Sequence, residues 1–343
     1  SVYSATSLLA LQNKAGNTEF YLVKHFVLIT FSFVAMWFSH RIDYKYYSKI
    51  SLIGLYISLP LLFFTYKFGV NINEASRWIS IPIINMAFQP SDLAKLSLII
   101  YLSSFLAKKQ YDLDNIRTLF MPFLWIGLIC LFIALTNLST ALILGATSIL
   151  LMFISRVKIS HLSLLILFIF FSGSVALLTG QRGYTAISRV EDFVNKKNIP
   201  YQLEQAYIAV STGGLFGKGP GNSNQKNFLP QSSSDFIYAI IIEEYGFIMG
   251  LSILILYLIL LYRGLKIFID SERPFGGLLS AGLSFALVIQ AITNMCVVVG
   301  LLPVTGVTLP LISMGGTSQL FTGITLGIIL SVSRQNNLET SYV

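Results

Sequence analysis

Charged residues are scarce in this sequence. Only 11% of its 343 residues are Asp, Glu, Lys or Arg, whereas soluble domains average about 25%. At the same time, 55% of the residues are hydrophobic, more than a single water-soluble core of this size can bury. A soluble enzyme is therefore excluded. Intrinsic disorder is excluded as well, because the chain contains 26 Phe and 17 Tyr residues.

Cysteine and histidine are also rare, which limits the chemistry available to the chain. The two cysteines, Cys130 and Cys296, lie in apolar runs, which argues against a disulfide scaffold or a cysteine-ligated metal. The three histidines are dispersed, so a Cys–His pair or a zinc cluster has little support. The glycine-rich run around Gly217 lacks the spacing of a phosphate-binding P-loop. Carboxylates remain as the catalytic candidates.

Long apolar stretches are abundant instead. A bilayer-spanning helix needs about 20 mostly apolar residues. Residues 118–155 carry no charge and would reach about 57 Å as one helix, so we expect them to fold back at the polar cluster 136–140. Residues 274–333 are also uncharged and predict two further spans with an uncharged connection.

Five other stretches complete a set of nine predicted spans. They cover residues 21–39, 50–66, 90–107, 160–180 and 236–261. The first ten residues resemble the end of a further span that is truncated at the start of the sequence. We therefore predict an all-α polytopic membrane protein with about ten transmembrane helices. It would form a single domain over residues 1–343, with a long extracytoplasmic loop at about 181–235.

The short loops predict the orientation of these spans. With residue 1 outside, the inner loops hold twelve Lys or Arg residues in short segments. The outer side holds eleven, but six of these are in the long loop, and long loops count little for topology. This bias places the carboxyl terminus on the cytoplasmic side and the long loop outside.

Three outer segments interrupt the apolar pattern. They cover residues 67–95, residues 213–236 at the end of the long loop, and residues 300–318, which are apolar but rich in Gly and Pro. Non-helical backbone at membrane depth is tolerated only where it packs in protein or lines a cavity. Because the three segments share one predicted face, we expect them to form one site.

Asp235 is the leading catalytic candidate among the outer carboxylates. It precedes an apolar helical run, where the helix dipole and free N–H groups favour a carboxylate. A plain helix cap would explain it equally. Glu243 and Glu244 lie about two turns deeper, where a carboxylate is costly and suggests function. An ion pair with Lys95 or an arginine is the alternative. The two glutamates point to different helix faces, so they cannot both line a cleft with Asp235.

Basic residues gather near these outer segments. They are Arg77, Lys95, Arg182, Arg189, Lys218 and Lys226. Cations facing a membrane-embedded site suit a phospholipid or a lipid pyrophosphate, although a solvated loop face would show the same pattern. Trp78, beside Arg77, would also serve as an interfacial anchor. Residues 184–194 have helical apolar spacing and predict a helix that lies on the membrane surface.

Taken in order, these motifs resemble the SEDS family (shape, elongation, division and sporulation proteins). The matching stretches are Val2-Tyr3-Ser4-Ala5, Ser76-Arg77-Trp78-Ile79, Gln89-Pro90-Ser91-Asp92 with Lys95, Gly213 to Lys226, Leu229-Pro230 with Asp235-Phe236-Ile237, Glu243-Glu244, Leu301-Leu302-Pro303-Val304-Thr305-Gly306 to Pro310, and Ser313 to Ser318. The resemblance thus runs over essentially the whole chain. Within the family, residues 219–226 are more similar to cell-division members than to elongation members.

The resemblance implies about ten spans with both termini cytoplasmic, in the bacterial inner (cytoplasmic) membrane, and an active site on the outer side. It implies a peptidoglycan glycosyltransferase that polymerises lipid II and releases undecaprenyl pyrophosphate. The implied partners are a class B penicillin-binding protein and other membrane proteins of the division machinery, with no nucleic acid. A lipid II flippase and a non-catalytic scaffold are the alternatives. The nearly charge-free spans favour the enzyme, because a flippase needs ionisable residues along its path.

The resemblance also assigns roles to residues. The family's essential aspartate aligns with Asp235, which we expect to be the general base. The six basic residues above, with Trp78, Ser223 and Gln225, are expected to bind substrate. Supporting roles are expected for Glu243, Glu244, Asp92, Pro303, Gly306, Pro310 and Ser313. A divalent cation, Mg²⁺ or Mn²⁺, is compatible with this chemistry, although no ligand cluster in the sequence supports one.

The sequence departs from the family pattern at three places. Gln231, Ser233 and Ser234 stand where the family usually has an acidic residue and a His-Thr pair. Asp92 replaces the usual Glu after Gln-Pro-Ser. Residues 136–140 are Thr-Asn-Leu-Ser-Thr in place of the usual Pro-Asp-Leu-Gly-Thr. The loss of a carboxylate there weakens the case for a role of that turn in binding or catalysis.

Overall fold

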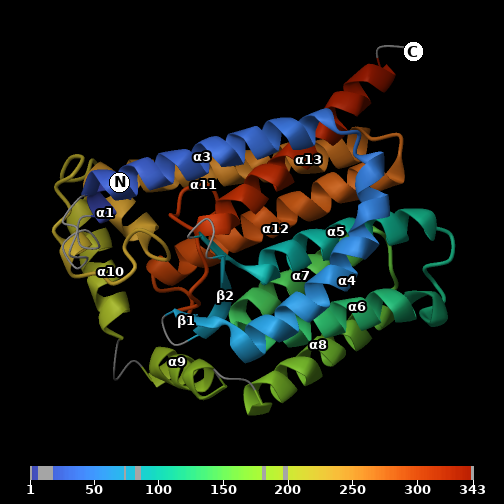
Figure 1. Ribbon diagram of the computed structural model, residues 1–343, viewed down its shortest axis with the longest axis horizontal. Coiled ribbons are helices and arrows are strands. Elements are labelled where there is room, and N and C mark those ends of the chain that lie inside the picture. The colour runs from blue at the N-terminus through green and yellow to red at the C-terminus, as the bar shows by residue number, and fades with distance from the viewer. Residues whose placement is uncertain are drawn as a thin grey trace. The chain divides into compact units, whose positions relative to one another are not determined.

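Helices dominate the structure. The computed structural model describes residues 2–6, 18–72, 75–81, 86–179, 183–195 and 200–340, and within them a helix occupies each of the nine predicted spans (Figure 1). These helices are α3 (Thr18–Arg41), α4 (Lys45–Phe68), α5 (Pro90–Lys108), α6 (Ile116–Ala134), α7 (Leu138–Ile154), α8 (Ile159–Thr179), α11 (Ile237–Asp270), α12 (Pro274–Val298) and α13 (Gly316–Thr340). Seven of them are long and apolar enough to cross a membrane. The predicted multi-pass helical fold is confirmed, and the exact number of spans stays a prediction.

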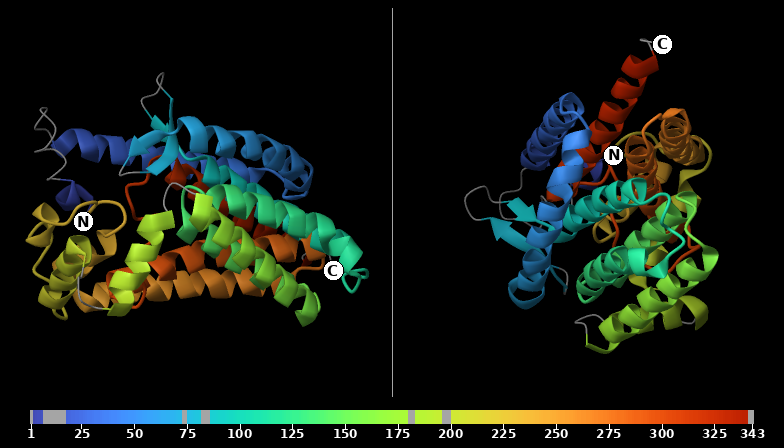
Figure 2. Two further views of the ribbon diagram at one scale, coloured as in Figure 1. Left: turned by 90° about the horizontal axis from the view of Figure 1, so that it is seen from below. Right: turned by 90° about the vertical axis from the view of Figure 1, so that its right-hand side faces the viewer.

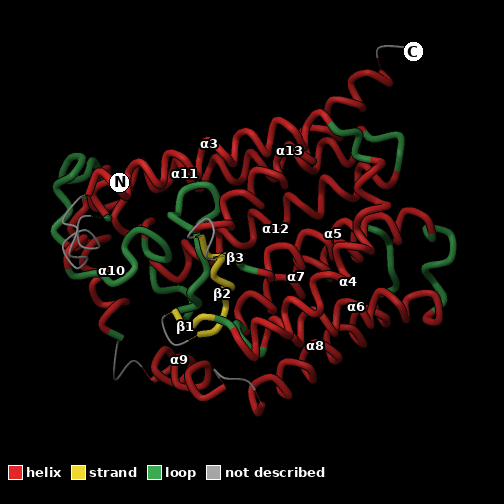
Figure 3. The backbone as a smooth tube through the Cα atoms, in the orientation of Figure 1, coloured by secondary structure: helices red, strands yellow, loops and turns green. Residues whose placement is uncertain are grey.

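Shorter elements lie between these helices. A helical turn, α1 (Val2–Ala5), opens the described chain, and α9 (Gly183–Asn195) forms the helix predicted at 184–194. The helix α10 (Tyr201–Gly213), the 3₁₀ turn η1 (Gln225–Asn227) and three strands were not predicted from the sequence. Figure 3 shows the strands in yellow. The long loop is therefore largely ordered as helices and turns.

The chain folds into two compact units, each assembled from separate stretches. The first unit comprises Ser1–Phe33, Ile187–Leu260 and Val288–Leu320. The second comprises Val34–Ala186, Leu261–Leu287 and Phe321–Val343. The organisation as a single domain stays a prediction.

The core of the second unit lies among its first helices. The helix α4 packs along α5, and α6 packs against α7 and α8 (Figure 2). Leu98, Leu102, Ile126 and Leu144 are among the side chains that are fully buried there. The predicted reversal at 136–140 is confirmed, because α6 ends at Ala134 and α7 begins at Leu138.

The first outer segment forms a small antiparallel sheet in the second unit. Its strands are β1 (Val70–Ile72), β2 (Ala75–Ile81) and β3 (Met86–Phe88), in the order β1-β2-β3. Trp78 pairs with Val70, and Ile79 pairs with Phe88. Arg77 and Trp78 thus lie on the central strand of this sheet.

Close helix packing in the second unit makes Gly327 sensitive to substitution. A Cβ atom at Gly327 of α13 would lie 2.4 Å from the Met36 carbonyl oxygen of α3. A Cβ atom at Gly173 of α8 would meet nothing closer than 3.9 Å. We expect Gly327→Ala to lower the melting temperature in detergent, because overpacking costs about 1–3 kcal/mol. Gly173→Ala, the matched control, should leave it unchanged or raise it, and equal melting temperatures would contradict the packing.

Candidate active site

Asp235 lies on the turns that precede α11. It is half-buried and comes two residues before the helix begins at Ile237. The N–H of Phe236 donates to the Gln231 carbonyl at 3.4 Å, and the N–H of Ala239 donates to the Phe236 carbonyl at 3.0 Å. A carboxylate therefore stands at the amino end of a helix, as both the catalytic and the capping interpretation require.

The outer segment between α12 and α13, residues 299–315, contains no helix, as its Gly and Pro content predicts. Side chains of the first unit donate to its carbonyl groups. Arg189 donates to Val304 at 3.3 Å, Gln290 donates to Thr308 at 3.0 Å, and Tyr257 donates to Pro310. Backbone groups outside helices must find partners in the protein when water is excluded, and this segment finds them in side chains.

This segment is bonded directly to the residues that carry Asp235. The Ser313 hydroxyl donates to the Ser234 carbonyl at 2.6 Å, and the N–H of Met314 donates to the Ser233 carbonyl at 2.8 Å. The carboxamide of Asn294 donates to the carbonyl of Asp235 itself, at 2.7 Å. The second and third outer segments therefore lie together, which is one part of the predicted arrangement of three. The first outer segment belongs to the other unit.

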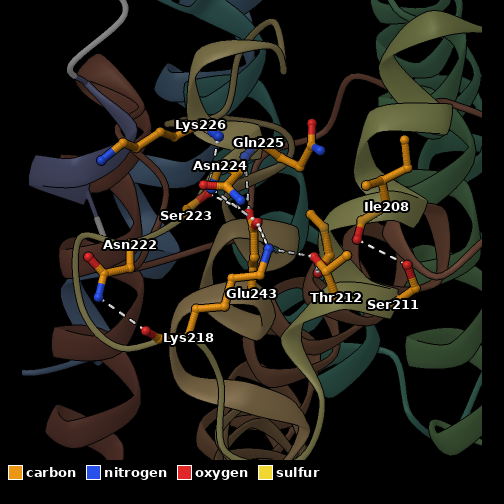
Figure 4. A network of polar contacts seen from close by, with 11 residues as sticks. Ile208, Ser211, Thr212, Lys218, Asn222, Ser223, Asn224, Gln225, Lys226 and Glu243 are labelled. Atoms are coloured by element: carbon orange, nitrogen blue, oxygen red, sulfur yellow. Dashed lines mark hydrogen bonds and ion pairs between the residues drawn. The ribbon is translucent and has the colours of Figure 1, made fainter.

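A second polar cluster surrounds Glu243, whose side chain is completely buried (Figure 4). The ammonium group of Lys218 lies 2.6 Å from its Oε1 atom. The Ser223 hydroxyl donates to Oε2, and the N–H groups of Asn224 and Gln225 donate to the carboxylate at 3.1 and 3.3 Å. One buried carboxylate thus holds a loop of several residues through charge-assisted hydrogen bonds.

The cluster decides between the two interpretations of Glu243. The side chain forms an ion pair, but its partner is Lys218 and not Lys95 or an arginine. Lys95 pairs with Asp92 at 2.8 Å in the first turn of α5. Lys218 also donates to the Thr212 hydroxyl at 2.9 Å. Lys218 and Ser223 thus contact Glu243 through their side chains and Gln225 through its N–H group, and their expected role in substrate binding stays a prediction.

The helix α11 is interrupted at Gly246, where φ is +83°. The main chain of residues 214–219 supplies the hydrogen bonds that this break removes from the helix. The bonded pairs are Lys218 N–H to Glu243 carbonyl at 2.9 Å, Gly219 N–H to Glu244 carbonyl at 2.9 Å, Phe247 N–H to Gly214 carbonyl at 2.9 Å, and Ile248 N–H to Leu215 carbonyl at 3.3 Å. Glu244, which is also buried, takes part in these bonds through its carbonyl group. The loop and the helix break therefore form one structure.

The loop approaches α11 so closely that glycine is required on both sides. A Cβ atom at Gly217 would lie 2.3 Å from the Glu244 carbonyl oxygen, and one at Gly246 would lie 2.2 Å from the Leu215 carbonyl oxygen. Both glycines also have positive φ, which side chains rarely adopt.

The other predicted binding residues are divided between the two units. Lys226 donates to the Gly221 carbonyl at 2.6 Å within the loop of the first unit. In the second unit, Arg77 is half-buried and donates to the Thr136 carbonyl of the α6–α7 turn at 3.4 Å, and Trp78 beside it is also half-buried. Arg182 lies outside the described residues. Among the described residues, no three His, Cys, Asp or Glu side chains form a group that could hold a metal ion.

The sequence analysis missed two residues of α12 that hold the segment between α12 and α13. Gln290 and Asn294 are polar residues on α12, one helical turn apart, within the uncharged run 274–333. Polar side chains four residues apart in an apolar span lie on one helix face, and this spacing was the available signal. The Ser232 hydroxyl donates to the Ala5 carbonyl at 3.0 Å, and no spacing in the sequence predicted this contact.

Relatives with similar sequences cover nearly the whole chain. The FtsW/RodA/SpoVE family model, described as "Cell cycle protein", matches residues 1–338. Stage V sporulation protein E of Bacillus subtilis (strain 168) is 34% identical, over 97% of this chain and 92% of that protein. A probable peptidoglycan glycosyltransferase FtsW of Geobacter sp. (strain M18) is 33% identical, over 97% of this chain and 91% of that protein.

Solved structures share the fold. One chain, from "Structural coordination of polymerization and crosslinking by a peptidoglycan synthase complex", aligns with a TM-score of 0.75 at 24% identity, over 97% of this chain and 95% of that one. The rod shape determining protein RodA of Thermus thermophilus aligns with a TM-score of 0.67 at 22% identity, over 98% of this chain and 94% of that one. At this identity the similarity concerns the fold alone.

The buried ion pair predicts a large effect of removing its cation. We expect Lys218→Met to lower the free energy of unfolding by about 3–5 kcal/mol, because Glu243 would be left buried without a counter-charge. Part of this loss should be recovered in Lys218→Met/Glu243→Gln. Lys158→Met is the matched control, because its pair with Asp114 is exposed at 3.5 Å and contributes about 0–1 kcal/mol. Thermal unfolding in detergent measures all three, and equal losses at Lys218 and Lys158 would refute the role of the buried pair.

The close approach at Gly217 predicts a difference between two glycines of the same loop. Gly217 and Gly221 have similar φ values of +78° and +81°, but a Cβ atom at Gly221 would meet nothing within 4 Å. Alanine therefore strains the backbone equally at both positions and clashes only at Gly217. We expect Gly217→Ala to melt at a lower temperature than Gly221→Ala and to expose residues 214–219 to proteolysis. Identical behaviour of the two variants would contradict the contact with α11.

Proposed function

This chain belongs to the FtsW/RodA/SpoVE family of cell cycle proteins, and from that membership we propose that it is a peptidoglycan glycosyltransferase. In this proposal it polymerises lipid II into glycan strands during cell division, on the outer side of the bacterial cytoplasmic membrane. The names of its relatives agree with the predicted glycosyltransferase class. The observation that carries the proposal is the position of Asp235 on the second outer segment, just before α11, where Asn294 and the third outer segment hold the main chain of residues 233–235.

Asp235 supplies the base in the proposed reaction. The sugar 4-hydroxyl of one lipid II molecule attacks the anomeric carbon of the growing chain from the face opposite the leaving group. The new carbon–oxygen bond forms while the bond to undecaprenyl pyrophosphate breaks, so the configuration inverts. The hydroxyl proton passes to the Asp235 carboxylate. A positioned base of this kind contributes about 10²–10⁴-fold to the rate.

The leaving group explains why one carboxylate is enough. Pyrophosphate is stable as an anion and needs no general acid, unlike the leaving group of a glycosidase, which uses two carboxylates. It needs positive charge nearby instead. Arg189 and Lys226 belong to the same unit as Asp235 and are the candidates for this role there. A divalent cation would supply the same stabilisation, and its involvement stays a prediction.

The partner in this proposal is a class B penicillin-binding protein, together with other membrane proteins of the division machinery. The family resemblance is the basis for this expectation. A structural neighbour of the chain comes from a peptidoglycan synthase complex, which is consistent with it. The experiment below also tests the flippase and scaffold interpretations.

The test is lipid II polymerisation by the purified full-length protein with its penicillin-binding protein, with transpeptidation blocked. We expect glycan strands from the wild type and at least about 100-fold fewer from Asp235→Asn, because the amide cannot accept the proton. Asp114→Asn is the matched control, since Asp114 forms an exposed ion pair in a loop of the other unit.

Each alternative result has a distinct meaning. Strands from both Asp235→Asn and the wild type would retain the enzyme but reject Asp235 as base. The absence of strands from an intact wild-type complex would reject the glycosyltransferase. A lipid II translocation assay on the same preparation would then distinguish the flippase from the scaffold.

A further inference from the structure

We propose that Asn294 is a positioning residue for Asp235. This inference rests on the function proposed above, in which Asp235 is the base. Asn294 lies on α12 and is 2% exposed. Its Nδ2 atom donates to the Asp235 carbonyl at 2.7 Å and to the Val307 carbonyl at 2.7 Å. Both N–H groups of one carboxamide are thus used, one on each of the two outer segments.

The helix α12 provides a rigid support for these bonds. Gln290, one turn before Asn294, donates to the carbonyl of Thr308, the neighbour of Val307. Two carboxamides on one helix face therefore hold two consecutive carbonyl groups of the outer segment. The two residues differ in one respect, because Asn294 also holds the main chain of Asp235, through the bond to its carbonyl.

The chemistry of Asn294 argues for positioning over simple stabilisation. Its Oδ1 atom is buried and has no hydrogen-bond partner among the described residues. A buried acceptor without a partner costs about 1–3 kcal/mol, so the value of this side chain lies in its two N–H donors. What the carboxamide provides is a fixed distance between α12, residue 307 and residue 235.

A base must be held in place to be effective. Displacement of a catalytic group by about 1 Å can cost about 100-fold in rate. Two other bonds that fix this region end at Ser233 and Ser234, through Met314 and Ser313. Without Asn294, the carbonyl of Asp235 loses the bond from this carboxamide, and the peptide group between Asp235 and Phe236 gains freedom to rotate. The carboxylate would then leave the attacking hydroxyl, while the binding of lipid II would be unaffected.

The experiment compares three variants of α12 in the complex of the full chain with its penicillin-binding protein. Asn294→Leu is nearly isosteric and removes both bonds. Gln290→Met removes the bond to Thr308 and leaves the bond between Asn294 and Asp235 in place. Thr293→Val is the control, because the Thr293 hydroxyl donates to the Ile289 carbonyl within the same helix, at 2.8 Å. The measured quantities are kcat and KM for lipid II polymerisation, and the melting temperature.

We expect Asn294→Leu to lower kcat by about 10–100-fold while KM stays within about threefold. Gln290→Met should retain kcat within about threefold, and Thr293→Val should match the wild type. A merely structural role of Asn294 predicts equal losses for Asn294→Leu and Gln290→Met, and this result would overturn the proposal. A rise in KM at unchanged kcat would overturn it as well. Should Asn294→Leu fail to fold, Asn294→Ser, which keeps one donor, carries the same test.

Hydrogen exchange on the same samples tests the anchoring without activity. Peptides that cover residues 232–240 and 304–310 should exchange faster in Asn294→Leu than in Thr293→Val. Equal exchange would overturn the anchoring, whatever the activity. An inactive wild type would reject the proposed glycosyltransferase, while faster exchange in Asn294→Leu would still establish the anchor. The failure of the two proposals is therefore distinguishable.

Discussion

The constraint on which this structure depends is the need of every backbone polar group outside a helix to find a partner when water is excluded. The first unit satisfies it in two ways. At Gly246 the main chain of residues 214–219 replaces the lost helical bonds of α11. Between α12 and α13, side chains of Arg189, Gln290 and Tyr257 donate to the carbonyl groups of a segment that forms no helix.

These two arrangements position the acidic residues of the candidate site as well as the backbone. The loop that covers the helix break is fixed by the buried carboxylate of Glu243 through Lys218 and the N–H groups that follow Ser223. The turns that carry Asp235 are fixed by Asn294 and Ser313. The carboxylate that we propose as the base thus stands on irregular backbone that is held from several directions. Irregular backbone is suited to this purpose, because its carbonyl groups accept such bonds and its N–H groups donate them.

Sequence reasoning predicted the parts that depend on local pattern. Apolar runs predicted the nine helices. The polar cluster 136–140 predicted the turn between α6 and α7, where Asn137 caps the amino end of α7. The amphipathic spacing of 184–194 predicted α9. It missed what depends on tertiary pairing: the small sheet, α10, and the interruption of α11, because residues 236–261 have the composition of a continuous span. For the same reason the sequence offered Lys95 or an arginine as the ion-pair partner in one interpretation of Glu243, whereas the loop folds Lys218 back onto the helix.

The most direct test of this account is native-state hydrogen exchange of the wild-type protein, resolved at Lys218, Gly219, Phe247 and Ile248. These four amides lie outside continuous helix, yet each donates to a carbonyl group in a bond that joins the loop to α11 at its break. The account predicts that they exchange as slowly as amides in the middle of α12, because opening them requires the loop and the helix to separate. Exchange at the rate of a solvated loop would contradict it, and with it the claim that the loop and the helix break form one structure.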